Sequence, residues 1–207
     1  MNIFWFLVSS LGLTSKSKAP LKLSLNGAPS GSFHRDSDIF HVQFAMIDQP
    51  LRLPVAVLLD NVRSMYNVGA FFRAADGVGL QKLCLCGITA HPPKKAISKT
   101  ALGAEETVAW EHDWDAVGVA EGLRGAGYQI AAIETGAHAA DLFEWQPRFP
   151  VCVMFGHEVD GLRPELLEIA DAHVRIPMMG RKNSLNVATA SGVVLYELLR
   201  KWRVMQE

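Results

Sequence analysis

Residues 176–198 read IPMMGRKNSLNVATASGVVLYEL and contain a change from strand to helix on which the interpretation of the whole chain depends. An apolar, strand-like run stops at Ile176 and Pro177, a polar loop follows, and a long apolar segment with helical spacing begins near Ser184. Ser184 is a favourable helix N-cap, whereas Asn186 in a first helical turn is poorly explained, because asparagine has a low helix propensity. We therefore expect a strand, a ligand-facing loop and a helix whose N-terminus favours an anionic group.

The same alternation of strand and helix runs through the rest of the chain from residue 54. Short apolar runs predict strands at 54–60, 82–88, 107–112, 128–134, 150–156 and 171–177. Helical spacing predicts helices at 67–79, 115–127, 164–170 and 184–203, while a basic, proline-containing segment predicts a loop at 91–99. Strands separated by helices are typical of a mostly parallel sheet with helices on both faces, so the predicted fold class is α/β.

Length and composition indicate one ordinary globular domain. The chain has 207 residues, of which 49% are hydrophobic and 20% are charged, and its formal net charge is −1. This charge argues against a protein that coats nucleic acid by bulk charge, but it is compatible with a local basic patch. The three cysteines, Cys84, Cys86 and Cys152, match no disulfide framework or zinc site, and the seven histidines show no metal-ligand spacing. We therefore expect a cytoplasmic protein without a bound metal.

Residues 1–45 differ in composition from the rest of the chain. The apolar start MNIFWFLVSSLG lacks the basic residues of a signal peptide and is too short to span a bilayer. The segment that follows is rich in Ser, Gly, Lys and Pro and has no periodicity. We expect residues 1–45 to be a poorly ordered extension, as would follow from a start codon assigned upstream of Met46, and residues 46–207 to form the functional domain.

Polar residues gather where four of the predicted strands end. The first strand leads into a loop and then NVGAFFR at 67–73, and the strand at 128–134 leads into Thr135 and Gly136. The strand at 150–156 ends in FGHEVDGL, and the last strand leads into the polar loop quoted above. Because the carboxyl ends of parallel strands lie at one edge of a sheet, we expect these four loops to build one pocket.

Each of these loops, taken singly, has an ordinary structural explanation. Asn67 is placed to cap the helix that follows it, and Arg73, nearly two turns further on, lies on a similar side of that helix. Gly69 lets another backbone approach closely, and Gly156 permits a tight turn that presents Glu158 at the strand end. The sequence has no Gly-rich phosphate loop and no G-x-S-x-G elbow, which argues against a nucleotide-binding protein and against a hydrolase.

The motifs in these loops, read together, are more informative about function than any one of them alone. In order they read N-x-G-x-x-x-R, F-G-x-E-x-x-G-L and I-P-M-x-G-x-x-x-S-L-N-V-A-x-A. This series resembles the three motifs of the SpoU/TrmH family, S-adenosylmethionine-dependent RNA 2′-O-ribose methyltransferases of the SPOUT class. The resemblance covers about residues 54–203 and includes the small-residue stretch at 99–104. It implies an α/β domain with a deep C-terminal trefoil knot, a homodimer and S-adenosyl-L-methionine as cofactor, although general rules of topology would have excluded a knot.

The resemblance also implies roles for single positions. The catalytic side would comprise Asn67, Arg73, Glu158, Ser184 and Asn186. The cofactor would be contacted by Thr135, Gly136, Gly156, Ile176 and Leu185, and Met178 would complete an apolar slot for a flat ring. Because a guanidinium is a poor base, we expect Arg73 to contact the reacting ribose or its phosphate and to stabilise the developing oxyanion.

An RNA surface is expected from basic residues near these loops. The candidates are Arg63, Lys94, Lys95, Lys99, Arg181 and Lys182. Residues 1–45 are too short and too rich in serine and glycine to form a separate RNA-binding domain, which favours a compact target such as tRNA. Three alternatives stay open: an rRNA methyltransferase of the same family, a non-catalytic RNA-binding knot protein, and a methyltransferase of the same fold that acts on a base.

Overall fold

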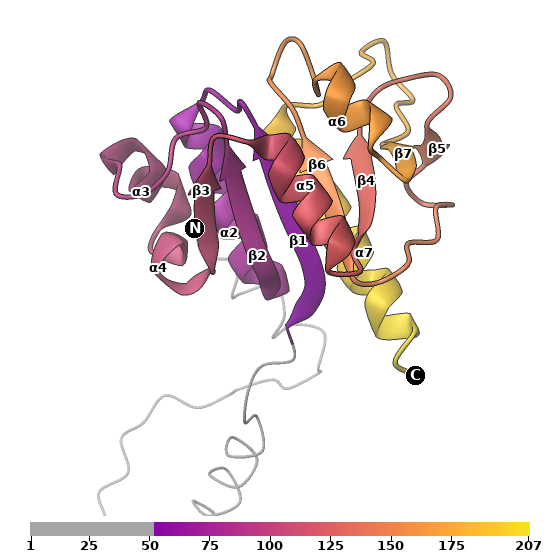
Figure 1. Cartoon of the computed structure of the whole chain (residues 1–207), viewed down its shortest axis with the longest axis horizontal. Coiled ribbons are helices and arrows are strands. Elements are labelled where there is room, and N and C mark those ends of the chain that lie inside the picture. Colours follow the sequence, from indigo (N-terminus) through magenta and orange to yellow (C-terminus); the bar gives the residue numbers. More distant parts are fainter. Residues whose placement is uncertain (1–51) are drawn as a thin grey trace, which may run out of the picture. The chain divides into compact units, whose positions relative to one another are not determined.

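The computed structural model describes residues 52–207, and the predicted extension at 1–45 lies outside the described residues. Figure 1 shows the order of the elements along the chain. They are β1 (Leu53–Asp60), α2 (Met65–Val78), β2 (Leu80–Cys86), α3 (Lys95–Ala101), α4 (Ala104–Thr107), β3 (Trp110–Asp113), α5 (Ala116–Gly125), β4 (Gln129–Ile133), β5 (Ala140–Asp141), β6 (Val151–Phe155), α6 (Pro164–Glu168), β7 (Ala172–Arg175) and α7 (Val187–Val204).

The seven strands form one sheet in the order β3-β2-β1-β6-β4-β7-β5, and every pairing between them is parallel. The predicted α/β class and parallel sheet are therefore confirmed. After β7, which lies three places from β1 in the sheet, the chain returns so that α7 packs against α2 and β1. That this return passes through a knot is implied by the family resemblance alone. None of the helices between residues 52 and 207 has the length and apolar character needed to cross a membrane.

The sheet is covered by helices on both faces, because β1 sends apolar side chains to both. Its residues Val57 and Leu59 join the core under α2 and α7, while Leu58, between them, joins the core under α5 and α6. All three side chains are fully buried. Figure 1 shows α5 and α6 in front of the sheet and α2 and α7 behind it. This two-sided burial makes β1 and its neighbour β6 a rigid base for the loops that follow them.

Helices α2 and α3 touch at Gly69, as the sequence predicted for that glycine. A Cβ atom at position 69 would overlap the Ile97 carbonyl oxygen and the Thr100 hydroxyl of α3. The Thr100 hydroxyl also lies 3.0 Å from the Tyr66 carbonyl oxygen, to which it donates a hydrogen bond. The glycine therefore lets α3 dock against the first turns of α2, next to the predicted site.

Several predicted boundaries were wrong. The segment predicted as a basic loop at 91–99 contains the start of α3, and the strand predicted at 107–112 is split between the end of α4 and a shorter β3. Strand β5 was not predicted, because it has two residues and is defined only by its pairing with β7. The two long helices α2 and α7 start at Met65 and Val187, close to but not at the predicted positions.

A buried lysine joins the last helix to the segment after β5. The side chain of Lys201 on α7 is 5% exposed, and its ammonium group donates to the carbonyl oxygens of Leu142 at 2.9 Å, Phe143 at 3.2 Å and Trp145. The carboxylate of Glu197 lies 3.6 Å from the same nitrogen. A buried charge is tolerated when it is paired and hydrogen-bonded, and here the charge holds a segment that has almost no sheet pairing.

We expect Lys201→Met to lower the free energy of unfolding by roughly 2–4 kcal/mol, because three carbonyl oxygens would lose a charged donor while the apolar stem stays in place. Urea denaturation measures this difference. Arg203→Met is the matched control, because Arg203 lies on the same helix and is exposed. Equal stability of the two variants would contradict a structural role for the Lys201 ammonium group.

Candidate active site at the carboxyl edge of the sheet

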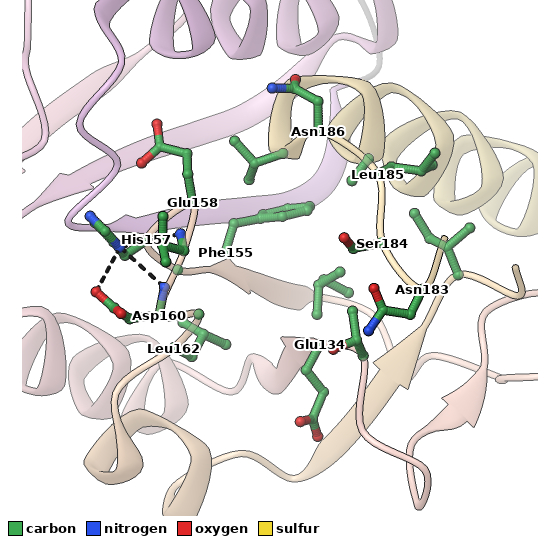
Figure 2. Close-up of a pocket in the computed structure, with 18 of the residues that line it drawn as sticks. Glu134, Phe155, His157, Glu158, Asp160, Leu162, Asn183, Ser184, Leu185 and Asn186 are labelled. Carbon is green, nitrogen blue, oxygen red and sulfur yellow. Dashed lines mark hydrogen bonds and ion pairs between the residues drawn. The ribbon is translucent and has the colours of Figure 1, made fainter. Parts of the chain in front are cut away.

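The four polar loops predicted from the sequence lie at one edge of the sheet, but only three of them line the cavity, and the loop after β1 does not. The strands β1, β6, β4 and β7 are neighbours, so their carboxyl ends lie side by side. A cavity of about 510 Å³ opens among the loops after β4, β6 and β7 and is also lined by the first turn of α7. Its size lies in the range usual for small-molecule sites. Figure 2 shows residues of this cavity, with Glu158 and Asn186 on one side and Glu134 on the other.

The loop after β6 folds back on itself directly behind Gly156. His157 and Gly161 exchange two backbone hydrogen bonds of 3.0 and 2.9 Å, and Gly161 has a φ of 74°, which favours glycine. A Cβ atom at position 156 would overlap the backbone of Gly161 and Leu162. Gly156 lines the cavity, but the close approach that requires a glycine there comes from its own loop and not from a ligand. The tight turn places Glu158 at the tip of the strand.

Glu158 binds the N-terminus of α2. Its carboxylate accepts hydrogen bonds from the backbone N–H groups of Arg63 at 3.1 Å and Ser64 at 2.9 Å, and from the side-chain amide of Asn67 at 3.0 Å. Partial burial raises the pKa of Glu158, but the Ser64 and Arg63 N–H groups and the Asn67 amide outweigh it, so that the net pKa lies below its ordinary value. Glu158 is therefore a charged group that links the first loop to the second.

The structure corrects both predicted helix caps. The cap of α2 is Ser64, whose hydroxyl accepts from the Asn67 backbone N–H at 3.3 Å, and Asn67 lies inside the first turn. The cap of α7 is Asn186, whose side-chain oxygen accepts from the N–H groups of Ala188 and Thr189, while Ser184 lies before the helix. The low helix propensity of Asn186, which looked unexplained, is thus accounted for by its capping position.

Asn67 and Asn186 also contact each other and so join the first motif to the third. The Asn186 side-chain amide lies 3.4 Å from the Asn67 side-chain oxygen and donates to it. Since Asn67 donates in turn to Glu158, one chain of hydrogen bonds connects Glu158, Asn67 and Asn186. Residues separated by up to 119 positions in the sequence are brought together in this way.

The predicted cofactor residues fall into two groups. The cavity is lined by Thr135, Gly156, Ile176, Met178 and Leu185, together with Ser184 of the predicted catalytic set. Ile176 and Met178 are half-buried, and Leu185 is 37% exposed, so apolar surface faces the cavity. Gly136 is not among the lining residues; it follows Thr135 in the loop after β4 and lies close to the Glu134 carboxylate.

Glu134 is a lining residue that the sequence did not single out. It follows the last residue of β4, and its carboxylate pairs with the Nδ1 of His173 on the neighbouring strand β7. The signal available in the sequence was its position, because an acidic residue follows a buried strand directly before Thr135. With Glu158 and Asp160, it places three carboxylates around the cavity, which favours a cationic ligand group there.

Arg73 and the predicted RNA-binding residues lie around the cavity and not in it. Arg73 is exposed on α2, about 9 Å along the helix axis from Asn67 at a rise of 1.5 Å per residue. Arg181 and Lys182 are exposed in the loop between β7 and α7, and Arg63 is exposed before α2. Lys94, Lys95 and Lys99 are exposed at α3. Within residues 52–207, no group of three or more His, Cys, Asp or Glu side chains is arranged to hold a metal ion.

The sequence between residues 54 and 196 matches the family model described as the SpoU rRNA Methylase family. The chain belongs to this family. The match covers all four loops of the site and confirms the resemblance drawn from the three motifs.

Two relatives show the range of named activities in this SpoU family. The chain is 31% identical over 147 residues to the tRNA (guanosine(18)-2'-O)-methyltransferase of Escherichia coli (strain K12), covering 71% of this chain and 63% of the relative. It is 31% identical over 148 residues to the 23S rRNA (guanosine-2'-O-)-methyltransferase RlmB of Vibrio vulnificus (strain CMCP6), covering 72% and 60%. The chain thus spans less than two thirds of the length of these relatives.

Solved structures agree with the fold. The TrmH/SpoU tRNA modifying enzyme of A. aeolicus has a TM-score of 0.68 and 29% identity, covering 75% of this chain and 78% of that one. An AdoMet-bound rRNA methyltransferase from Sinorhizobium meliloti has a TM-score of 0.66 and 31% identity, covering 73% and 57%. A structure described as giving insights into the 2-OH methylation of C/U34 on tRNA has a TM-score of 0.63 and 27% identity, covering 72% of this chain and 97% of that one.

The Glu158 network of this SpoU domain makes its stability depend on pH. The folded-state pKa of Glu158 is lowered from 4.5, so its stabilising contribution is present above the unfolded pKa and is lost as the pH falls through the folded pKa. We expect Glu158→Gln to be less stable than the wild type at about pH 7 and this difference to be smaller at about pH 3.

Urea denaturation of both proteins at the two pH values measures this difference. Glu121→Gln, at an exposed position of α5, is the control. A stability gap between Glu158→Gln and the wild type that stayed constant in acid would show that the charge on Glu158 is not what stabilises the fold.

Proposed function

We propose that the protein transfers a methyl group from S-adenosyl-L-methionine to a ribose 2′-hydroxyl of RNA. The observation that carries the proposal is the chain of hydrogen bonds from Glu158 through Asn67 to Asn186, which joins the three motif loops beside one cavity. The names of the relatives support the same reaction, since both the tRNA and the rRNA enzymes are 2′-O-methyltransferases.

The cavity fits the proposed cofactor in shape and in charge. Its apolar wall of Ile176, Met178 and Leu185 suits a flat ring. The carboxylates of Glu134, Glu158 and Asp160 already have partners in the protein, so they would favour a sulfonium and an ammonium group through the negative potential of the cavity. When bound, the cofactor supplies an electrophilic methyl group. The AdoMet-bound rRNA methyltransferase from Sinorhizobium meliloti supports this assignment.

The side chains of this domain divide into positioning groups and reacting groups. Glu158 is held as a carboxylate by three N–H donors, so its role is to fix the loop after β6 on α2 and not to take up a proton. Asn67 and Asn186 use their amides within the same network, and Asn186 in addition caps α7. Ser184 presents its hydroxyl on the cavity wall, where we expect it to orient the ribose.

Arg73 remains the residue best suited to the RNA side. A guanidinium stays protonated in proteins and donates hydrogen bonds in a fixed geometry. Because Arg73 is exposed on α2 and does not line the cavity, it would reach the reacting nucleotide from outside, at the ribose or the adjoining phosphate. There it would stabilise the negative charge that develops on the 2′-oxygen while the hydroxyl proton passes to solvent water.

We propose tRNA as the substrate class, with rRNA as the alternative. The structure described as giving insights into the 2-OH methylation of C/U34 on tRNA and the tRNA methyltransferase of Escherichia coli support this substrate class. The match to the 23S rRNA enzyme is equally strong in identity and keeps rRNA open. We further propose a homodimer, as the resemblance implies, which light scattering would test.

Substituting Arg73 separates catalysis from cofactor binding. We expect Arg73→Ala to lower turnover by about 100- to 1000-fold, the usual effect of removing a donor that stabilises a developing oxyanion, while the Kd for S-adenosyl-L-methionine stays unchanged. Methyl transfer from labelled cofactor to bulk RNA and calorimetric titration measure the two quantities. Arg124→Ala, on α5, is the control, and near-normal turnover of Arg73→Ala would remove Arg73 from the mechanism.

Mass spectrometry of nucleosides tests the function as a whole. In a deletion strain of the source organism, we expect one 2′-O-methylated nucleoside to be reduced in the tRNA fraction and restored by the cloned gene. A reduction in the rRNA fraction would keep the chemistry and replace the substrate class. A missing base-methylated nucleoside would favour the base methyltransferase, and no change together with cofactor binding in vitro would favour the non-catalytic RNA-binding protein.

A further inference from the structure

A row of four aromatic rings lies at the edge of the sheet formed by β3 and has no part in the proposed methyl-transfer chemistry. Trp110 stacks on His91, with ring centroids 5.9 Å apart and an interplanar angle of 23°. His91 lies 4.7 Å from His112, and His112 meets Trp114 edge to face at 5.3 Å. The row, defined by Trp110, His91, His112 and Trp114, ends in a side chain that is 73% exposed.

The exposed end of the row is not explained by packing. Trp114 follows the last residue of β3, which is an edge strand, and it is the most exposed Phe, Trp or Tyr side chain in residues 52–207. A single exposed apolar side chain is normal on a protein surface, but Trp114 differs from such a side chain because it continues a row of ordered rings. The inner end is anchored, since Trp110 also meets the buried Phe72 of α2 edge to face at 6.5 Å.

Backbone hydrogen bonds fix the orientation of the two histidines. The Nε2 of His112 lies 3.1 Å from the Gly87 carbonyl oxygen, and the Nδ1 of His91 lies 2.8 Å from the Pro92 carbonyl oxygen. Because a carbonyl can only accept, each of these ring nitrogens donates. The rings are held in place, so Trp114 rests on a preformed support and not on a mobile loop.

The row is connected to the candidate active site through neighbouring strands and hydrogen-bonded loops. The ends of β1, β2 and β3 are in register, with Asp60 beside Cys86 and Cys86 beside Asp113. Two parallel strand spacings, about 10 Å, therefore separate the start of the β1 loop from Asp113 next to Trp114. The loops are also bonded to each other, because the Val62 N–H donates to the Thr89 hydroxyl at 3.0 Å and the Ile88 N–H donates to the Asn61 side chain at 3.1 Å.

The charges around the row favour a base on the tryptophan and phosphates on the neighbouring helix. Lys94 and Lys95 are exposed at the start of α3, in the segment that follows His91. The carboxylates of Asp113 and Asp115 flank Trp114, but they accept from the backbone N–H groups of Asp115 at 2.9 Å and Gly118 at 3.0 Å. An RNA backbone would avoid these two carboxylates and follow the lysines, which leaves the π face of Trp114 for a base.

We propose that this aromatic row is a stacking surface for an unpaired nucleotide of the RNA substrate that lies close to the methylated one. The inference rests on the proposed function, because it takes RNA as the partner. An exposed indole stacks with any base, and stacking of this kind contributes to affinity without reading the sequence. The surface would hold RNA in position while Arg73 and the cavity act on the neighbouring ribose.

The test compares three variants of the full chain in binding to a single-stranded RNA oligonucleotide of about twelve nucleotides and to bulk tRNA. We expect Trp114→Ala to weaken binding by about 5- to 100-fold and to leave the salt dependence unchanged, since no charge is removed. Trp114→Phe should retain most of the affinity. Phe143→Ala, which removes a 53% exposed ring near the opposite edge of the sheet, should have no effect.

Two further measurements separate this inference from the proposed function. Calorimetric titration with S-adenosyl-L-methionine should give the same Kd for Trp114→Ala and for the wild type. The absence of both cofactor binding and methyl transfer in the wild type would refute the proposed function, whereas RNA affinity of Trp114→Ala equal to that of the wild type would refute the stacking surface. Unchanged RNA affinity together with an altered oligomeric state would assign the row to a protein interface and overturn the proposal.

Discussion

The contact on which the candidate site depends is that of the Glu158 carboxylate with the N-terminus of α2. Helix N-termini leave backbone N–H groups without partners, and an anionic side chain satisfies them and interacts favourably with the helix dipole. Here the anion comes from a loop 94 to 95 residues further along the chain. The loop after β6 can reach α2 only because β6 lies next to β1 in the sheet. The strand order is thus a precondition for the network, and the network in turn fixes the wall of the cavity.

The parallel sheet explains why the loops of the candidate site lie at one edge. All strands end in the same direction, and the loops after β1 and β6 start from rigid strands that are almost entirely buried. Asp60 at the end of β1 is 1% exposed and pairs with Arg163 through two hydrogen bonds of 2.9 and 3.0 Å, which fastens the far end of the β6 loop as well. The loop that carries Glu158 is therefore held at both ends, by α2 and by Asp60. Such a loop can position a ligand without a large loss of conformational entropy on binding.

The sequence predicted the α/β class and the three motifs because these depend on local patterns. It failed where two polar neighbours compete for one role. Ser184 and Asn186, or Ser64 and Asn67, are all acceptable caps, and the choice between them depends on where the chain leaves the preceding loop. Lys201 reads as a surface residue, and only the fold shows that it is buried against carbonyl groups. The sequence also did not predict the row from Trp110 to Trp114, because His91 comes from another segment of the chain and joins the row only in the fold.

The hydrogen-bond network also limits which polar groups of the domain are free to meet the proposed RNA substrate. The polar groups of Glu158, Asn67 and Asn186 are largely engaged with one another and with helix N-termini, so the network shapes the cavity more than it offers free groups. Arg73, the strongest donor near the site, stands about 9 Å along α2 from Asn67 and outside the cavity. Under the proposed function, the cofactor side would therefore be preorganised, whereas the catalytic side would be complete only when a ribose spans the gap between the cavity and Arg73. The proposed reaction would then be coupled to correct placement of the RNA, and surfaces that hold flanking nucleotides would contribute to the rate by positioning the 2′-hydroxyl.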